Sequence, residues 1–178
     1  MPAPMGELGT SAVRVRVPAT SANLGPGFDV LGLALAVHNE VEMRLLPEGL
    51  QVEVEGEGAS ELPFDEGNLA YRAAVAGFTS MGWAPPGLGI RVVNRIPLAR
   101  GMGSSSATIV GSLLAASELA RRAKIREIRG LAHRRLLELA VELEGHPDNV
   151  VPAAVGGFTI CLPGGPGVRY LAFRRRMP

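Results

Sequence analysis

Glycines and serines are concentrated between residues 96 and 108, where the sequence is IPLARGMGSSSAT. Gly101 and Gly103 permit a positive φ and carry no Cβ that would block a close approach to the backbone. The three serines that follow can cap a helix or offer hydroxyl groups, and a long apolar run comes after them. Backbone N–H groups and the positive end of a helix dipole would then face a bound anion. We therefore predict an anion-binding loop that leads into a helix, and the alternative is an ordinary capped helix after a turn.

The loop lacks the lysine of the GxxxxGK[ST] nucleotide-binding motif. The whole chain has one lysine, Lys124, and 17 arginines. If the loop holds a nucleotide phosphate, its charge must be met by backbone donors, a helix dipole, a divalent cation and arginine. The scarcity of lysine also has a compositional explanation, because the chain is rich in Ala, Gly, Arg and Pro.

Two of the three aspartates lie in glycine- or proline-rich stretches, and each is paired with an asparagine. Asp29 ends the stretch GPGFD, six residues after Asn23, and Asp148 precedes Asn149 in GHPDN. Rigid loops that present an amide and a carboxylate suit a small polar substrate with hydroxyl and ammonium groups. The alternative is turn chemistry, because Asp and Asn side chains hydrogen-bond their own backbone.

Glu138 and Glu142 are four residues apart in a predicted helix, so they share a face and repel one another unless a cation lies between them. One of them is a candidate Mg²⁺ ligand, because this ion takes one or two carboxylates together with substrate phosphates. The alternative is a solvated face on which Arg134 and Arg135 relieve the repulsion. Spacing alone does not choose between the two glutamates. His146 is expected to be a turn residue bonded to backbone, rather than a base or a metal ligand.

The composition limits the class of protein. The chain has 178 residues, of which 47% are hydrophobic and 4% aromatic, and its formal net charge is +1. This charge balance and the few aromatic stacking platforms argue against a nucleic-acid binder. Cys161 is the single cysteine, so it is expected in the core of a protein from a reducing compartment. Without a signal-peptide pattern or an apolar run long enough to cross a membrane, the sequence predicts a cytoplasmic protein.

The first half of the chain predicts a sheet. Residues 13–17 alternate as VRVRV, which is typical of a strand with two arginines on one face. An apolar run covers residues 30–37, and two further strands are expected at 41–46 and 50–55 around a turn at 47–49. Together these segments favour an antiparallel sheet.

The rest of the chain mixes helices and strands. Helices are predicted at 68–80, from residue 104 onward and at 131–144, with short strands at 90–93 and 158–162. The helix that begins at residue 104 is apolar on nearly every side, so we expect it to be buried. The segments expected to lack regular structure are residues 1–12, 18–29, 82–89 and a turn beginning at residue 146. Residues 121–130 are expected to be a solvated connection or the end of a helix. The mixed order of elements favours an α+β fold.

Three segments together resemble the GHMP kinase superfamily of small-molecule kinases, and within it the homoserine kinases most closely. PATSANLGPGFDVLGLAL is similar to the amino-terminal signature of the homoserine kinases, IPLARGMGSSSAT to the superfamily's phosphate loop, and EGHPDNVVPAAVGG to its substrate loop. The order and spacing of the three segments also fit. A lone GxGSS would be weak evidence, but three motifs in register are specific.

The resemblance implies an α+β fold like the second domain of ribosomal protein S5, with a mixed or antiparallel sheet packed on helices. Residues 13–165 would form this ATP-binding domain, after a mobile start at 1–12. Residues 166–178 would begin the crossing to a ferredoxin-like carboxyl-terminal domain, of which this chain has no counterpart. The expected enzyme is therefore represented here by an incomplete fragment.

The resemblance also implies the chemistry: transfer of the ATP γ-phosphoryl group to the side-chain hydroxyl of L-homoserine, on the route to threonine. Ser105 and Glu138 would bind Mg²⁺, although the run of three serines leaves open which hydroxyl faces the metal. Asn23, Asp29 and Asn149 would hold homoserine, with Asp29 on its ammonium group and Asn149 orienting its hydroxyl. The residues expected to hold the triphosphate are Pro97, Leu98, Ala99, Arg100, Gly101, Met102, Gly103, Ser104, Ser105 and Ser106.

Other functions stay open at this stage. A different kinase of the superfamily could take mevalonate or a sugar as its acceptor. A non-catalytic nucleotide-binding module is the alternative from another class, and a homodimer could cover an apolar face that lacks its second domain. No nucleic-acid or membrane partner is expected.

Overall fold

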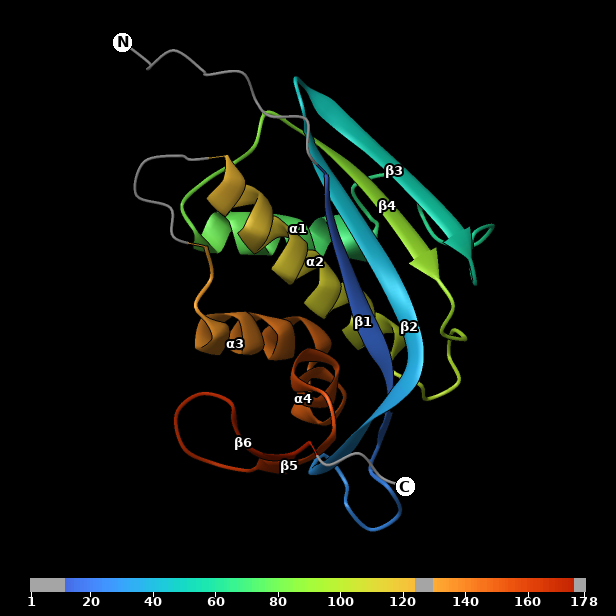
Figure 1. Cartoon of the computed structure of the whole chain (residues 1–178), viewed down its shortest axis with the longest axis vertical. Helices are drawn as coiled ribbons and strands as arrows, with labels where there is room; N and C mark the ends of the chain where they lie inside the picture. Colours follow the sequence, from blue (N-terminus) through green and yellow to red (C-terminus); the bar gives the residue numbers. More distant parts are fainter. Residues whose placement is uncertain (1–11, 124–129, 175–178) are drawn as a thin grey trace.

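The computed structural model describes residues 12–123 and 130–174 of the chain. It has six strands and four helices in mixed order, and one six-stranded mixed sheet has helices packed on one face (Figure 1). This confirms the α+β fold class. Residues 1–11, which belong to the expected mobile start, and residues 124–129 of the expected connection lie outside the described residues. The elements are β1 (Val13–Ala22), β2 (Leu31–Leu46), β3 (Gly49–Gly56), α1 (Leu69–Ser80), β4 (Gly87–Asn94), α2 (Ser104–Arg122), α3 (His133–Glu144), α4 (Pro147–Val155), β5 (Phe158–Leu162) and β6 (Arg169–Phe173).

The long strand β2 organises the sheet. It pairs with β1 along one edge, and along the other edge with β4 at its carboxyl-terminal half and β5 at its amino-terminal half. The expected apolar run and the strand at 41–46 are thus one continuous strand. All of these pairs are antiparallel, as the sequence predicted.

The expected pairing around the turn at 47–49 is wrong. β3 does not pair with β2; instead β4 lies between them and pairs with β3 in parallel. A parallel pair needs a crossover connection, and α1 supplies it between β3 and β4. The sheet is therefore mixed, and its β4 strand begins at Gly87, inside a segment that was expected to be a loop.

Helix α2 runs behind the sheet and forms the centre of the core. Val110 and Leu113 of α2 are fully buried, as are Val41 and Met43 of β2. The helix is enclosed as predicted, and a fully packed helix cannot shift without breaking many contacts. The packing of α2 therefore holds its amino terminus in a defined position.

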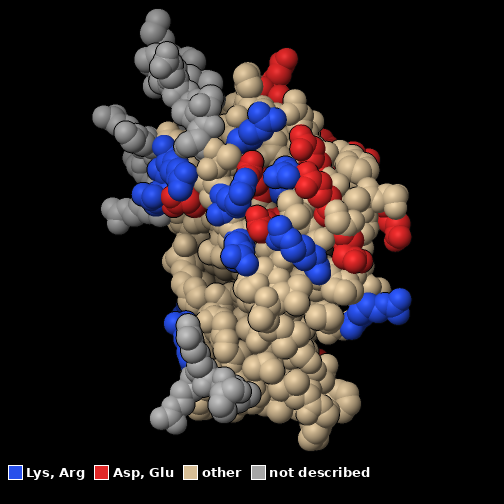
Figure 2. Space-filling view, turned by 45° about the vertical axis from the view of Figure 1, so that its right-hand side comes forward, with Lys and Arg blue, Asp and Glu red and all other residues tan. Residues whose placement is uncertain are grey.

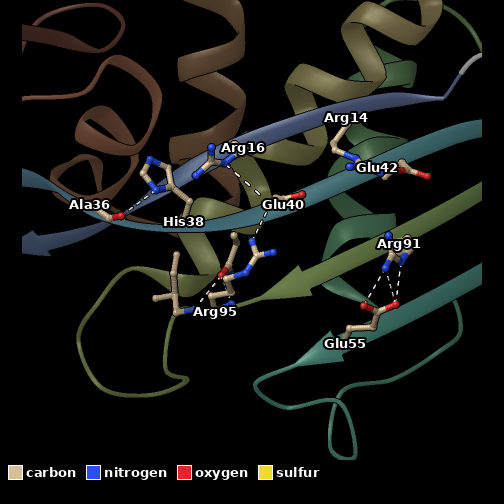
Figure 3. A network of polar contacts seen from close by, with 11 residues as sticks. Arg14, Arg16, Ala36, His38, Glu40, Glu42, Glu55, Arg91 and Arg95 are labelled. Carbon is tan, nitrogen blue, oxygen red and sulfur yellow. Dashed lines mark hydrogen bonds and ion pairs between the residues drawn. The ribbon is translucent and has the colours of Figure 1, made fainter.

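The opposite face of the sheet carries ion pairs. Arg14 pairs with Glu42, and Glu40 accepts a hydrogen bond from Arg95, the residue that follows β4 (Figure 3). The hydrogen bond from Arg95 lowers the pKa of Glu40. Figure 2 shows that charged side chains gather on one half of the molecule in this view, whereas the other half is nearly free of charge. The two arginines of the VRVRV strand are thus part of a solvated, internally paired surface.

The sheet continues past residue 165. Residues 169–173, where we expected the start of an interdomain crossing, form β6 and pair with β5 in antiparallel register. The single cysteine, Cys161, is buried on β5 as expected. None of the described helices combines the length and the apolar character that crossing a membrane requires.

Candidate functional site

A pocket of about 350 Å³ lies at the amino-terminal end of α2. Its lining residues come from the loop between β4 and α2, the start of α1 and the end of α3, among other segments. Both apolar and polar side chains line the pocket. The apolar ones include Val54, Leu62, Leu69, Val92 and Leu98, and the polar ones include Ser104, Ser105, Glu144, His146 and Asn149.

The glycine-serine loop has the backbone that an anion site needs. Gly101 and Gly103 have φ values of 69° and 64°, and even Ala99 has a positive φ of 54°. Gly103 is the residue before α2, and no side chain caps this end of the helix. The first N–H groups of a helix have no partner within it, so here they are left to a ligand. The loop therefore leads into a helix as expected and no serine caps that helix, while anion binding by the loop stays a prediction.

Thr20 holds the loop and Asn149 together. The backbone N–H of Thr20 donates to the carbonyl of Met102 at 3.0 Å. Its hydroxyl donates to Asn149 Oδ1 at 2.6 Å, and a Cβ at Gly103 would collide with that hydroxyl. Because the amide oxygen is occupied, the NH₂ group of Asn149 is the part that remains for the pocket. Thr20 lies within the PATSANLGPGFD segment, but its fully buried side chain was not singled out from the sequence.

The structure does not bring Glu138 to the loop. Its carboxylate accepts a hydrogen bond from Arg134 at 2.9 Å and pairs with Arg135 at 3.6 Å. The hydrogen bond from Arg134 lowers the pKa of Glu138. Arg135 also pairs with Glu142, so the solvated face that we considered as the alternative is what the structure has.

Glu144 takes the place that we expected Glu138 to fill. Glu144 Oε1 accepts hydrogen bonds from the hydroxyls of Ser105 at 2.6 Å and Ser106 at 2.7 Å. It is the last residue of α3, because the backbone of Gly145 turns to a φ of 99° and ends the helix there. Counting residues back from Asn149 therefore selected a carboxylate that does not contact the loop serines, and which glutamate binds Mg²⁺ stays a prediction. The signal that was available is that Glu144 immediately precedes the helix-ending glycine, where a side chain can point past the helix end.

Asn23 and Asp29 lie apart from this pocket. Asn23 Oδ1 accepts the backbone N–H of Asp29 at 3.1 Å, and both residues have a positive φ. Neither lines the pocket at the start of α2. The turn chemistry that we considered is therefore present, and a role for either side chain in binding a substrate stays a prediction.

The segment after Gly145 is a helix and not the expected turn. Pro147 occupies the first turn of α4, where its missing N–H costs nothing. His146 Nδ1 lies 2.7 Å from Asp148 Oδ1, so its partner is a side chain and not the backbone as we expected. Asp148 is only 1% exposed and also accepts the N–H of Asn149 at 3.0 Å. The pair fixes His146 at the pocket wall beside Asn149.

The polar side chains of the pocket offer part of an oxygen ligand set for a hard divalent cation. The described residues contain no group of three or more His, Cys, Asp or Glu side chains that could hold a metal by themselves. Glu144 and the Ser105 hydroxyl offer one carboxylate and one hydroxyl oxygen. Such a partial oxygen set suits Mg²⁺, which completes its coordination with substrate phosphates and water.

Comparison with known proteins agrees with this geometry. Residues 68–157 match the model of the GHMP kinases N terminal domain. A homoserine kinase of Streptomyces coelicolor is 49% identical over 150 residues, which are 84% of this chain and 47% of that protein. One from Symbiobacterium thermophilum is 51% identical over 163 residues, 90% of this chain and 50% of that protein.

A solved structure extends the likeness to three dimensions. The crystal structure of homoserine kinase from Cytophaga hutchinsonii superposes with a TM-score of 0.78 at 29% identity, over 92% of this chain and 52% of that one. The chain spans about half the length of the curated relatives it matches. The expected type of domain is thereby confirmed.

Proposed function

The chain belongs to the GHMP kinase family, and from this membership we propose that it forms the nucleotide-binding half of an enzyme that phosphorylates L-homoserine. The observation that carries the proposal is the start of α2, where uncapped backbone N–H groups face a pocket and Glu144 is held against Ser105. If a phosphate binds at this helix end, the Glu144 carboxylate would repel it unless a cation lies between the two. A nucleotide with a divalent ion meets this requirement.

The two kinds of side chain in the pocket suit the two parts of ATP. The apolar side chains, Val54, Leu69 and Val92 among them, suit a purine base. The phosphates would then lie over the loop from Gly101 to Ser106, where the helix dipole and backbone N–H groups act on them. Glu144 and Ser105 would hold Mg²⁺, which neutralises charge on the β- and γ-phosphates when it is bound.

Asn149 is placed to orient the acceptor hydroxyl. Its amide oxygen is bonded to Thr20, so its NH₂ group can donate to the attacking oxygen or to a phosphate oxygen. The hydroxyl oxygen forms a bond to the γ-phosphorus while the bond to the leaving ADP oxygen breaks. The hydroxyl proton departs with the phosphate product or to water. We assign no general base to His146 or Asp148, because a loose transition state needs positioning and charge neutralisation more than proton removal.

We further propose that Asp29 and Asn23 bind the ammonium end of homoserine, as the family resemblance implies. Asn23 already bonds the backbone of Asp29, so the Asp29 carboxylate is exposed and open to a cation. Because this chain spans about half of its relatives, we expect it to bind MgATP weakly by itself and to turn over little homoserine.

Calorimetric titration of the chain with ATP, with and without Mg²⁺, tests the proposal. We expect heat with MgATP and weaker binding with ATP alone. The absence of heat with either would overturn the nucleotide site. Phosphate transfer by a protein of the relatives' length, tested with homoserine, mevalonate and a sugar, decides the acceptor, and preference for another alcohol would replace homoserine in the proposal.

A further inference from the structure

Two buried asparagines lie at the root of the loop that runs from β4 to α2. Asn39 on β2 is 0% exposed, and Asn94 at the end of β4 is 3% exposed. A polar side chain that is withdrawn from water must find hydrogen-bond partners inside the protein. Asn39 has no place in the binding site described above, so its burial needs an explanation of its own.

The Asn39 amide oxygen ends strand β4. It accepts the backbone N–H of Arg95 at 2.8 Å and that of Ile96 at 2.9 Å. The ladder between β2 and β4 stops at the pair Glu40 and Val93. The two N–H groups that follow β4 therefore bond to a side chain where a strand would have continued. This turns the chain out of the sheet one residue before Pro97, where the phosphate loop begins.

The same side chain reaches the start of α2. Backbone N–H groups can only donate, so they fix which end of the Asn39 amide is the oxygen and aim its NH₂ group the other way. Asn39 Nδ2 donates to Asn94 Oδ1 at 2.9 Å and to Ser104 Oγ at 3.3 Å. Ser104 is the first residue of α2 and lines the pocket. One amide thus connects both ends of the loop.

Asn94 extends the link to the residue that follows β3. Its Nδ2 donates to the carbonyl of Glu57 at 3.1 Å, and the N–H of Glu57 donates to the Asn94 carbonyl at 3.0 Å. Both polar atoms of the Asn94 side chain are therefore occupied within the protein. Asn94 lines the pocket, but the hydrogen bonds of its side chain are made with Asn39 and Glu57.

We infer that Asn39 is a positioning residue for the phosphate loop: it sets the separation between the end of β4 and the first turn of α2, and so the spacing of the N–H groups that receive a phosphate. This inference rests on the proposed function for its ligand. Asn39 touches no ligand itself and acts through Arg95, Ile96 and Ser104.

The test compares Asn39→Ala with Val41→Ala. Val41 is also fully buried on β2 and packs on Gly111 of α2, away from the loop. Amide hydrogen exchange of the ligand-free chain should be about tenfold faster at Arg95 and Ile96 in Asn39→Ala than in Val41→Ala, because both N–H groups lose their acceptor. Asn39→Asp keeps an acceptor oxygen and should restore protection at these two amides. Asn39→Ser replaces Asn39→Ala if the latter does not fold, since its short hydroxyl reaches neither amide.

The ligand measurement separates positioning from mere stability. Calorimetry should give about tenfold weaker MgATP binding for Asn39→Ala and an unchanged affinity for Val41→Ala, while adenosine affinity stays the same in both. Equal exchange in the two variants would overturn the inference, and so would an Asn39→Ala affinity for MgATP within about twofold of the unaltered chain. If the unaltered chain binds no MgATP, the proposed function fails, while the exchange comparison still decides whether Asn39 holds the loop.

Discussion

The hydroxyl of Ser105 donates a hydrogen bond to Glu144 Oε1 at 2.6 Å, which joins the first turn of α2 to the last residue of α3. The contact places a carboxylate beside backbone N–H groups that have no side-chain cap. A carboxylate at this position would repel a phosphate in the same pocket unless a cation lay between them. The contact therefore determines which acidic residue is the metal ligand in our proposal.

Replacing Glu144 should remove the dependence of nucleotide binding on magnesium. We expect Glu144→Gln to lower the affinity for MgATP at least tenfold while changing the affinity for metal-free ATP little, because the amide is a poorer Mg²⁺ ligand. Titration calorimetry at several Mg²⁺ concentrations measures this. Glu138→Gln is the matched control and should leave both affinities unchanged, since Glu138 pairs with Arg134. Equal losses in the two variants would refute the assignment.

Adding a methyl group to Gly103 should damage both stability and binding. Gly103 has a φ of 64°, and its new Cβ would meet the Thr20 hydroxyl. We expect Gly103→Ala to lower the free energy of unfolding by about 2–4 kcal/mol, from strain and the collision together. Urea unfolding measures the loss. Gly101→Ala shares the positive φ but has open space around its Cβ, so it should cost only about 1–2 kcal/mol.

Removing the Thr20 hydroxyl should free the Asn149 amide. Thr20→Val keeps the shape but leaves Asn149 Oδ1 without its 2.6 Å partner. We expect a loss of about 1–3 kcal/mol in the free energy of unfolding, because the bond is shielded from water. Thr20→Ser retains the hydroxyl and should lose less. Chemical denaturation measures the free energy of unfolding of both variants. A lower value for Thr20→Ser than for Thr20→Val would contradict the role of this bond.

Cys161 should resist alkylation in the folded protein. Burial raises the pKa of its thiol to about 11, and the negative charge of Asp148 adds to the effect. Only the thiolate reacts, so at pH 8 we expect iodoacetamide to react at least about 100-fold more slowly than in urea. The rate is followed by mass spectrometry. Similar rates in the folded and unfolded chain would show that the thiol is exposed or ionised.

Glu118 should stabilise the fold at neutral pH and not in strong acid. Hydrogen bonds from Arg121 and Arg122 lower its pKa from 4.5 to about 2. A lowered pKa in the folded state gives stability that is complete above the unfolded value and is lost as the pH falls toward 2. Because the side chain is 30% exposed, we expect Glu118→Gln to cost about 1 kcal/mol or less at pH 7. The difference from the unaltered chain should shrink between pH 4.5 and 2, and a constant difference would argue against the ion pair.

Helices α1, α2 and α3 were predicted from the sequence, whereas α4 was not. Helix α1 begins after Asn68, whose side chain accepts the N–H of Ala70 at 2.9 Å, and this cap is a local feature of the sequence. The parallel pairing of β3 with β4 could not be predicted in the same way. A strand pattern gives the faces of a strand but not its neighbours, which are settled by contacts between distant segments.

The sequence by itself determined the glycine loop at residues 101–106 and the family to which the chain belongs. Positive φ at Gly101 and Gly103 is a property of the residues themselves, so it can be predicted from residue types. Only the tertiary structure decided which carboxylate meets the loop. Glu138 is paired with Arg134 one helical turn away, whereas Glu144 meets Ser105 from 39 residues further along the chain. Local backbone preferences are set within a few residues, but a contact between two helices depends on how the whole core packs them.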